Sequence, residues 1–188
     1  DQCFHVTTAN LKSCFHRQLD VETTQNYLTD LIMPNSRFVI HKPVSFFDEG
    51  SANMIRLSAG DRGLYLFVSG SVDTKKFMSR QDKRARKQLV QNHQLTSDQI
   101  VYLTQHPQSI DAGVFHNDVI SFGLDDLLVV HEKSFVNQNQ QCEIIADQYD
   151  KLFNQSLLVI QIPSSILSLE AAVDSYFFNS QLVRKTQE

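Results

Sequence analysis

Residues 114–131 read VFHNDVISFGLDDLLVVH. Two strand-like runs, VFHNDVISF at 114–122 and LLVVH at 127–131, flank Gly123-Leu124-Asp125-Asp126, and a loop of that length and composition is typical of a β-hairpin. The following residues predict a helix over roughly 140–154 and then a strand, LLVIQIP at 157–163, which ends at its proline. The stretch therefore predicts the order hairpin, helix, strand.

The same order is predicted earlier in the chain. Strand signals at 38–41 and 44–47 lead into GLYLFVSG at 63–70, and a polar helix over about 82–92 precedes the strand signal IVYLT at 100–104. A unit of two strands, one helix and one strand that recurs after roughly 60 residues indicates repeated α/β modules. It argues against a doubly wound sheet, in which strands and helices alternate strictly.

The organisation of the whole chain follows from these modules. We expect them at about 37–104 and 114–163, within a single domain over 1–188, because no low-complexity stretch or long Gly/Ser linker interrupts the chain. Flanking helices are predicted at 20–32 and, behind Ser168 as N-cap, up to residue 182.

Composition narrows the class of protein. With 17 Lys and Arg against 21 Asp and Glu, the formal charge is −4, which gives no net attraction to nucleic acid or to an anionic membrane. No run approaches the roughly 18 apolar residues of a membrane span. An odd number of cysteines without CxxC spacing favours free thiols in a reducing compartment, so we expect a cytoplasmic protein. The chain opens inside a predicted strand and lacks an initial Met, as expected for a piece of a longer protein.

The segment GVFHNDVI, residues 113–120, holds the first candidate site residues. If it is a strand, its side chains alternate, and His116 and Asp118 point to the same face. An imidazole exchanges protons near neutral pH, and a carboxylate pairs well with a planar guanidinium. The alternative is a polar strand end, in which His116 bonds to the backbone and Asp118 caps a turn.

Further candidates lie in three short segments. Glu49, in Asp-Glu-Gly directly after the apolar run at 44–47, is placed where a catalytic carboxylate emerges at the mouth of a sheet, although such a tripeptide is also a common solvated turn. The adjacent His16 and Arg17, and Arg80 before the polar helix, suit the carboxylates of an anionic substrate. The alternative for these three residues is an ordinary solvated surface.

Several cofactor signatures do not occur in the sequence. It has no Gly-rich phosphate loop, no GxSxG elbow, no HExxH helix and no EF-hand loop. His131-Glu132 lacks a third ligand nearby in the sequence, which makes it a weak metal motif. We therefore expect neither a metal nor an organic cofactor.

Taken together, five segments resemble, in this order, blocks of the N-succinylarginine dihydrolase family. They are TTANLKSCFHR, FFDEGSANMIRL, GVFHNDVI, VHEKSF and AAVDSYFFNSQLV, and the resemblance runs from about residue 5 to residue 184. It implies a pentein fold, the α/β propeller of guanidine-modifying enzymes, here a partial propeller of ββαβ modules. It also implies hydrolysis of N2-succinylarginine to N2-succinylornithine, ammonia and carbon dioxide in arginine catabolism, without a metal or cofactor.

The resemblance also implies roles for single residues. Glu49 and His116 match two members of the family's Cys-His-Glu catalytic set, and Asp118 matches a substrate-binding acid. The remaining substrate contacts match His16, Arg17 and Arg80. The family's nucleophilic cysteine lies in a Gly-rich segment that this chain lacks, so the chain alone is expected to be inactive.

Two alternatives stay open at this point. One is another guanidine-modifying pentein enzyme, of the arginine deiminase or amidinotransferase kind, and the other is a pentein-like binding module without catalysis. A partial propeller exposes strand edges and apolar faces, so a homodimer is a further expectation.

Overall fold

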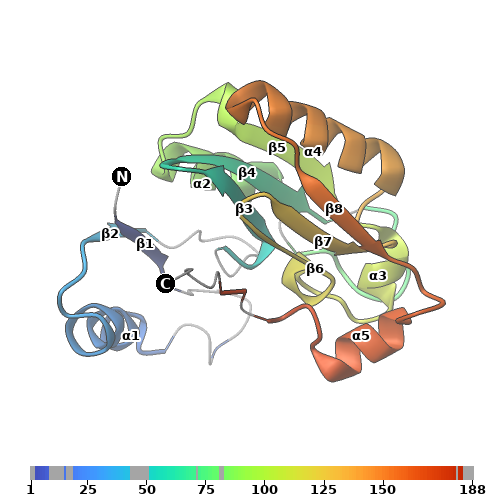
Figure 1. Ribbon diagram of the computed structural model, residues 1–188. Helices are drawn as coiled ribbons and strands as arrows, with labels where there is room; N and C mark the ends of the chain where they lie inside the picture. Colours follow the sequence, from blue (N-terminus) through green and yellow to red (C-terminus); the bar gives the residue numbers. More distant parts are fainter. Residues whose placement is uncertain are drawn as a thin grey trace. The chain divides into compact units, whose positions relative to one another are not determined.

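The computed structural model describes residues 3–8, 15, 19–42, 51–70, 72–80, 83–180 and 182–183 (Figure 1). The chain divides into two compact units. The first comprises Asp1–Ala52 and Arg80–Leu95, and the second comprises Asn53–Ser79 and Thr96–Glu188.

Two three-stranded sheets of the same topology build the second unit. In each, an antiparallel hairpin is followed by a strand that pairs in parallel with the hairpin's second strand. The first sheet comprises β3 (Met54–Ala59), β4 (Arg62–Ser69) and β5 (Ile100–Thr104). The second comprises β6 (Ser121–Leu124), β7 (Leu127–His131) and β8 (Leu158–Ile162). The predicted order of hairpin, helix and strand thus occurs twice along the chain. The first hairpin differs from the prediction, because its first strand is β3, which the sequence did not predict. Residues 38–41, predicted as a strand of that module, instead pair with residues 4–7 in the first unit.

The two sheets meet at the β6–β7 turn. Asp125 has a φ of 51°, a left-handed conformation that Asp tolerates better than most residues. Its carbonyl accepts from the Ser58 N–H at 3.0 Å, and its carboxylate accepts from the Ser58 hydroxyl at 2.8 Å. A Cβ on Gly123 would lie 2.7 Å from Leu57 Cδ2 and 2.8 Å from Ile55 Cγ2, so any larger residue there would force these core side chains to shift.

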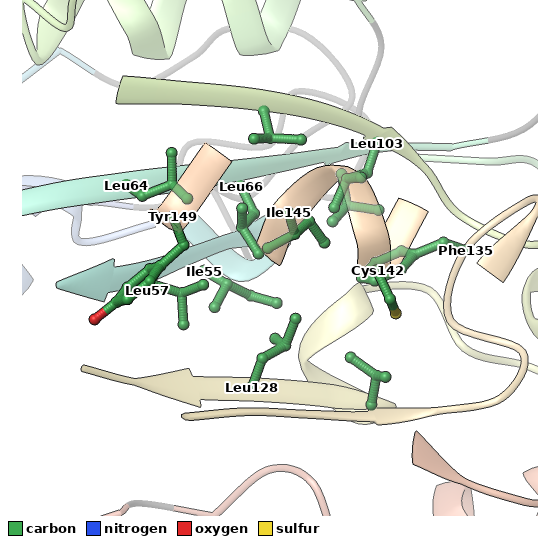
Figure 2. Close-up of a cluster of buried hydrophobic side chains, with 13 residues drawn as sticks. Ile55, Leu57, Leu64, Leu66, Leu103, Leu128, Phe135, Cys142, Ile145 and Tyr149 are labelled. Carbon is green, nitrogen blue, oxygen red and sulfur yellow. The ribbon is translucent and has the colours of Figure 1, made fainter. Parts of the chain in front are cut away.

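Helix α4 (Gln138–Phe153) closes the main core of this unit. Its buried residues Cys142, Ile145 and Tyr149 are spaced three and four apart, so one helix face meets Leu57 and Leu66 of the first sheet (Figure 2). The Tyr149 hydroxyl stays satisfied inside this core, because it donates to the Ser58 carbonyl at 2.9 Å.

Shorter helices complete the second unit. They are the 3₁₀ turns η4 (Ser97–Gln99) and η5 (Asn117–Val119), and the helices α3 (Pro107–Asp111) and α5 (Leu169–Ser175). The predicted cap of α5 is confirmed, because the Ser168 hydroxyl accepts from the Ala171 N–H at 3.1 Å. The helix ends well before residue 182, at Tyr176, whose φ of 51° is left-handed. Ala172 of α5 and Phe178 belong to a second buried cluster with Val114.

Among its described residues, the first unit holds a small parallel sheet and several helical segments. Its elements are β1 (Phe4–Thr7), α1 (Val21–Asn26), the π-helix η2 (Tyr27–Ile32), β2 (Phe38–His41) and α2 (Lys83–Asn92), with β1 paired to β2. The 3₁₀ turn η3 (Ser51–Asn53) spans the boundary between the units. The predicted strand at 44–47 lies outside the described residues. In the part of the chain that the structure covers, no helix is both long and apolar enough to cross a membrane.

Candidate functional site

The predicted strand over 114–122 is wrong for most of its length. Only from Ser121 does the backbone join a sheet, while residues 117–119 form a 3₁₀ turn that His116 precedes as an extended residue. The turn is closed by the Val119 N–H, which donates to the His116 carbonyl at 3.3 Å. The alternation of a strand therefore does not place His116 and Asp118 on one face.

Buried hydrogen bonds hold this turn. Asn117 is 1% exposed, and its backbone N–H donates to the Asn53 side-chain oxygen at 2.7 Å. Its amide nitrogen donates to the Ser134 carbonyl at 3.3 Å, and the Ser121 hydroxyl donates to the Asn117 carbonyl at 2.9 Å. Satisfied buried polar groups favour one conformation of the backbone. His116 and Asp118 thus lie on either side of Asn117, whose buried hydrogen bonds fix the backbone at this turn.

The two flanking side chains differ in their surroundings. His116 is half-buried as a residue, and its Nε2 atom is buried. Asp118 is also half-buried, and its carboxylate accepts from the Asn179 amide at 3.2 Å. Asn179 belongs to the AAVDSYFFNSQLV segment, so the structure brings together two of the five segments on which the family resemblance rests.

A loop lies against the residues that precede this turn. The Asp111 carboxylate accepts from the backbone N–H groups of Lys76 at 2.7 Å, Lys75 at 3.0 Å and Phe77 at 3.3 Å. These backbone bonds lower the pKa of Asp111. The ring of Phe77 meets that of Phe115 edge to face at 5.3 Å, which links the loop to the residue before His116.

The other predicted site residues fall elsewhere. Glu49, His16 and Arg17 lie outside the described residues. Arg80 is half-buried and belongs to the first compact unit. Sequence reasoning missed Asn53, which is 2% exposed and follows Glu49 by four residues in the FFDEGSAN segment. The signal available in the sequence was only its place in the FFDEGSAN segment, because its burial is known only from the structure.

Among the described cysteines, Cys142 is buried and its thiol is not activated. Cys142 is packed in the main core, and burial raises the pKa of its thiol to about 11. It is therefore protonated at neutral pH and is not a nucleophile. Cys3 is half-buried, and Cys14 lies outside the described residues.

His131 has a structural role. It is fully buried, and its Nδ1 accepts from the Lys133 N–H at 3.0 Å. The hydrogen then sits on Nε2, which donates to the Leu167 carbonyl at 2.9 Å. Glu132 accepts from the Ser164 hydroxyl at 2.5 Å. Both ring nitrogens of His131 are thus used by the backbone, which leaves none for a metal.

A different group of histidines could hold a metal. In the first unit, the ligand atoms of His5, His41 and His93 all lie within 4.8 Å of one another. His5 Nδ1 and His41 Nε2 lie 2.8 Å apart. Sequence reasoning missed this cluster because its members lie far apart in the chain and no spacing motif links them.

Comparisons with known proteins agree with the segments found in the sequence. A family model described as succinylarginine dihydrolase matches residues 1–188. The N-succinylarginine dihydrolase of Burkholderia multivorans is 38% identical over 193 residues, which cover 96% of this chain and 43% of that protein. That of Shewanella loihica is 38% identical over 197 residues, covering 97% and 43%. The chain thus spans less than half the length of the curated relatives it matches.

Among solved structures, the chain is similar to the N-terminal domain of ArgZ, an arginine dihydrolase from the ornithine–ammonia cycle in Cyanobacteria. The two are 12% identical, with a TM-score of 0.49, over 92% of this chain and 67% of that one.

Proposed function

This chain belongs to the succinylarginine dihydrolase family, and from that premise we propose that the complete protein hydrolyses N2-succinylarginine to N2-succinylornithine, ammonia and carbon dioxide. The observation that carries the proposal is the buried bond from Asn117 to Asn53. It ties the FHND segment, which contains the proposed base His116, to the FFDEGSAN segment, in whose sequence Glu49 precedes Asn53 by four positions.

The proposed reaction consumes two waters and releases two molecules of ammonia. A cysteine thiolate from a part of the protein outside this chain attacks the guanidinium carbon, and ammonia departs with a proton from His116. His116 then takes a proton from the water that displaces the sulfur. A second round releases the second ammonia, and the resulting carbamate loses carbon dioxide to leave the amine of N2-succinylornithine.

The acidic and basic candidates have complementary tasks in this proposal. Glu49 and Asp118 hold the cationic guanidinium, for which a carboxylate is the natural partner. The Asn179 amide positions the Asp118 carboxylate for this contact. On the other side of the substrate, His16, Arg17 and Arg80 bind the succinyl and α-carboxylates.

The proposed architecture extends the observed repeat. The two sheets of the second unit share one topology, and we assign them to two ββαβ modules of a pentein propeller that the rest of the protein completes. Residues 1–188 form part of that single domain. We place the protein in the cytoplasm and expect a homodimer, in which a second copy would cover Leu158 and Ile160 of β8, which are 59% and 43% exposed in this part of the protein.

Substrate choice tests this proposal. The complete protein should release ammonia from N2-succinylarginine and much less from arginine, because arginine lacks the succinyl carboxylate. The 188-residue chain assayed beside it should be inactive, since it lacks the nucleophile. Ammonia release from arginine alone would favour a sister enzyme of the arginine deiminase kind. Silence on both substrates would favour a binding module.

A further inference from the structure

We propose that His5, His41 and His93 bind one divalent transition-metal cation, and that Zn²⁺ is the ion that suits these three imidazoles. The site is independent of the proposed function, because it lies within the first compact unit and uses none of the residues assigned to the reaction.

The three ligands come from three separate elements. His5 lies in β1 and His41 ends β2, and the two face each other across parallel strands whose register pairs His5 with Val39 and Thr7 with His41. His93 follows the last residue of α2, and its N–H donates to the Leu89 carbonyl at 2.9 Å. A bound ion would therefore join the small sheet to the end of a helix.

The geometry is close to that of a metal site. A tetrahedral zinc ion with Zn–N bonds of about 2.0–2.1 Å holds its nitrogens about 3.3 Å apart. The His5 and His41 nitrogens are 2.8 Å apart, and the three ligand atoms lie within 4.8 Å of one another. The rings of His41 and His93 have their centroids 4.3 Å apart. The His5 ring stacks on the rings of His41 and His93, with centroids 5.1 and 5.0 Å apart, so the side chains must rotate for the three nitrogens to point at one ion.

The protonation state of the cluster also suits a metal. Burial, and then the neighbouring His41 and His5, lower the pKa of His93 to about 4. Burial likewise lowers the pKa of His5 and that of His41. All three rings are therefore neutral at pH 7, the form in which imidazole ligates a metal. Ion binding moves the hydrogen shared by His5 and His41 to an outer ring nitrogen.

Access and coordination number indicate what kind of site this is. His5 is exposed whereas His41 is only 8% exposed, so an ion enters from the side of His5. Three protein ligands leave the fourth position of a tetrahedral ion open to water. We assign the site a stabilising role in the first unit, since a ligand that binds only the folded state raises stability by mass action.

Zinc titration of the purified complete protein, after removal of metals with a chelator, tests the site. One equivalent of Zn²⁺ should bind and raise the melting temperature. Each of His5→Gln, His41→Gln and His93→Gln should weaken binding by more than about 100-fold, because even outer-shell changes around a metal cost about 10–100-fold. The control is His106→Asn, which lies in the other unit and keeps an acceptor at the α3 N-cap, and it should bind as the unaltered protein does. Unchanged zinc binding in all three variants would overturn the proposal.

X-ray absorption spectroscopy of the unaltered, zinc-loaded protein tests the same site without relying on the folding of variants. The spectrum should show three imidazole nitrogens at about 2.0–2.1 Å from the ion. A sulfur ligand, fewer than two imidazoles, or no retained zinc would refute the site.

Discussion

Two runs that the sequence predicts as strands, one for each sheet of the second unit, fold differently. Residues 63–69 lie within strand β4, whereas 114–122 break into a 3₁₀ turn before β6. The first run buries its side chains in an apolar core, with Leu64 and Leu66 fully buried. The second run instead buries Asn117, whose hydrogen bonds reach Asn53 and Ser134. Regular structure thus serves the core, and the irregular turn presents His116 and Asp118.

The largest loss of stability should come from the regular run. Leu66→Ala leaves a cavity in the main core and should lower the free energy of unfolding by about 2–5 kcal/mol, measured by urea denaturation of the complete protein. Leu158→Ala is the matched control, because this side chain of β8 is 59% exposed. An equal loss in both variants would mean that β4 is not the centre of the core.

Substitutions in the irregular run should lower the free energy of unfolding by less, and they act through one hydrogen-bond network. Asn117→Ala removes the amide that donates to Ser134 and should cost about 1–3 kcal/mol by urea denaturation. Asn53→Ala leaves the Asn117 N–H buried without its acceptor and should cost a similar amount. In the double variant the losses should be less than additive, because both residues belong to one network. Strictly additive losses would show that Asn117 and Asn53 act independently of each other.

The sequence predicted the regular parts of this comparison well. Apolar runs, the Gly-Leu-Asp-Asp loop and the Ser168 cap are local signals, and the strands β4, β5, β7 and β8 follow them. The turn at 117–119 could not be found in this way, because its bonds to Asn53 and Ser134 join residues that lie far from it in the chain. The cluster of His5, His41 and His93 could not be predicted either, because its members also lie far apart in the chain. Local patterns do not report contacts of that range.

The loop beside the turn should respond to acid. The backbone N–H groups that bind Asp111 lower its pKa in the folded state, so their contribution is present above the ordinary value of 3.8 and is lost as the pH falls through the lowered one. In NMR spectra, the Lys76 amide signal should shift with a midpoint below 3.8. Asp111→Asn should remove this titration while the sheets stay folded. A midpoint at or above 3.8 would contradict the assigned bonds.

The smallest effect on stability is expected at Asn179. Its bond to Asp118 is exposed, so Asn179→Ala should change the free energy of unfolding by less than about 0.5 kcal/mol. In the complete protein it should nevertheless raise the KM for N2-succinylarginine, because the Asp118 carboxylate loses its positioning partner. Asn139→Ala, an exposed change in α4, serves as control and should leave the KM unchanged. An unchanged KM in Asn179→Ala would mean that the position of the Asp118 carboxylate does not matter for substrate binding.

His116→Ala in the complete protein tests most directly whether the irregular turn serves chemistry. Ammonia release from N2-succinylarginine and the melting temperature should be measured together. We predict a loss of roughly 10²–10⁴-fold in kcat, the usual contribution of a general acid–base residue, with a melting temperature close to that of the unaltered protein. Retained activity, or a loss that only follows unfolding, would contradict the assignment of His116 to catalysis.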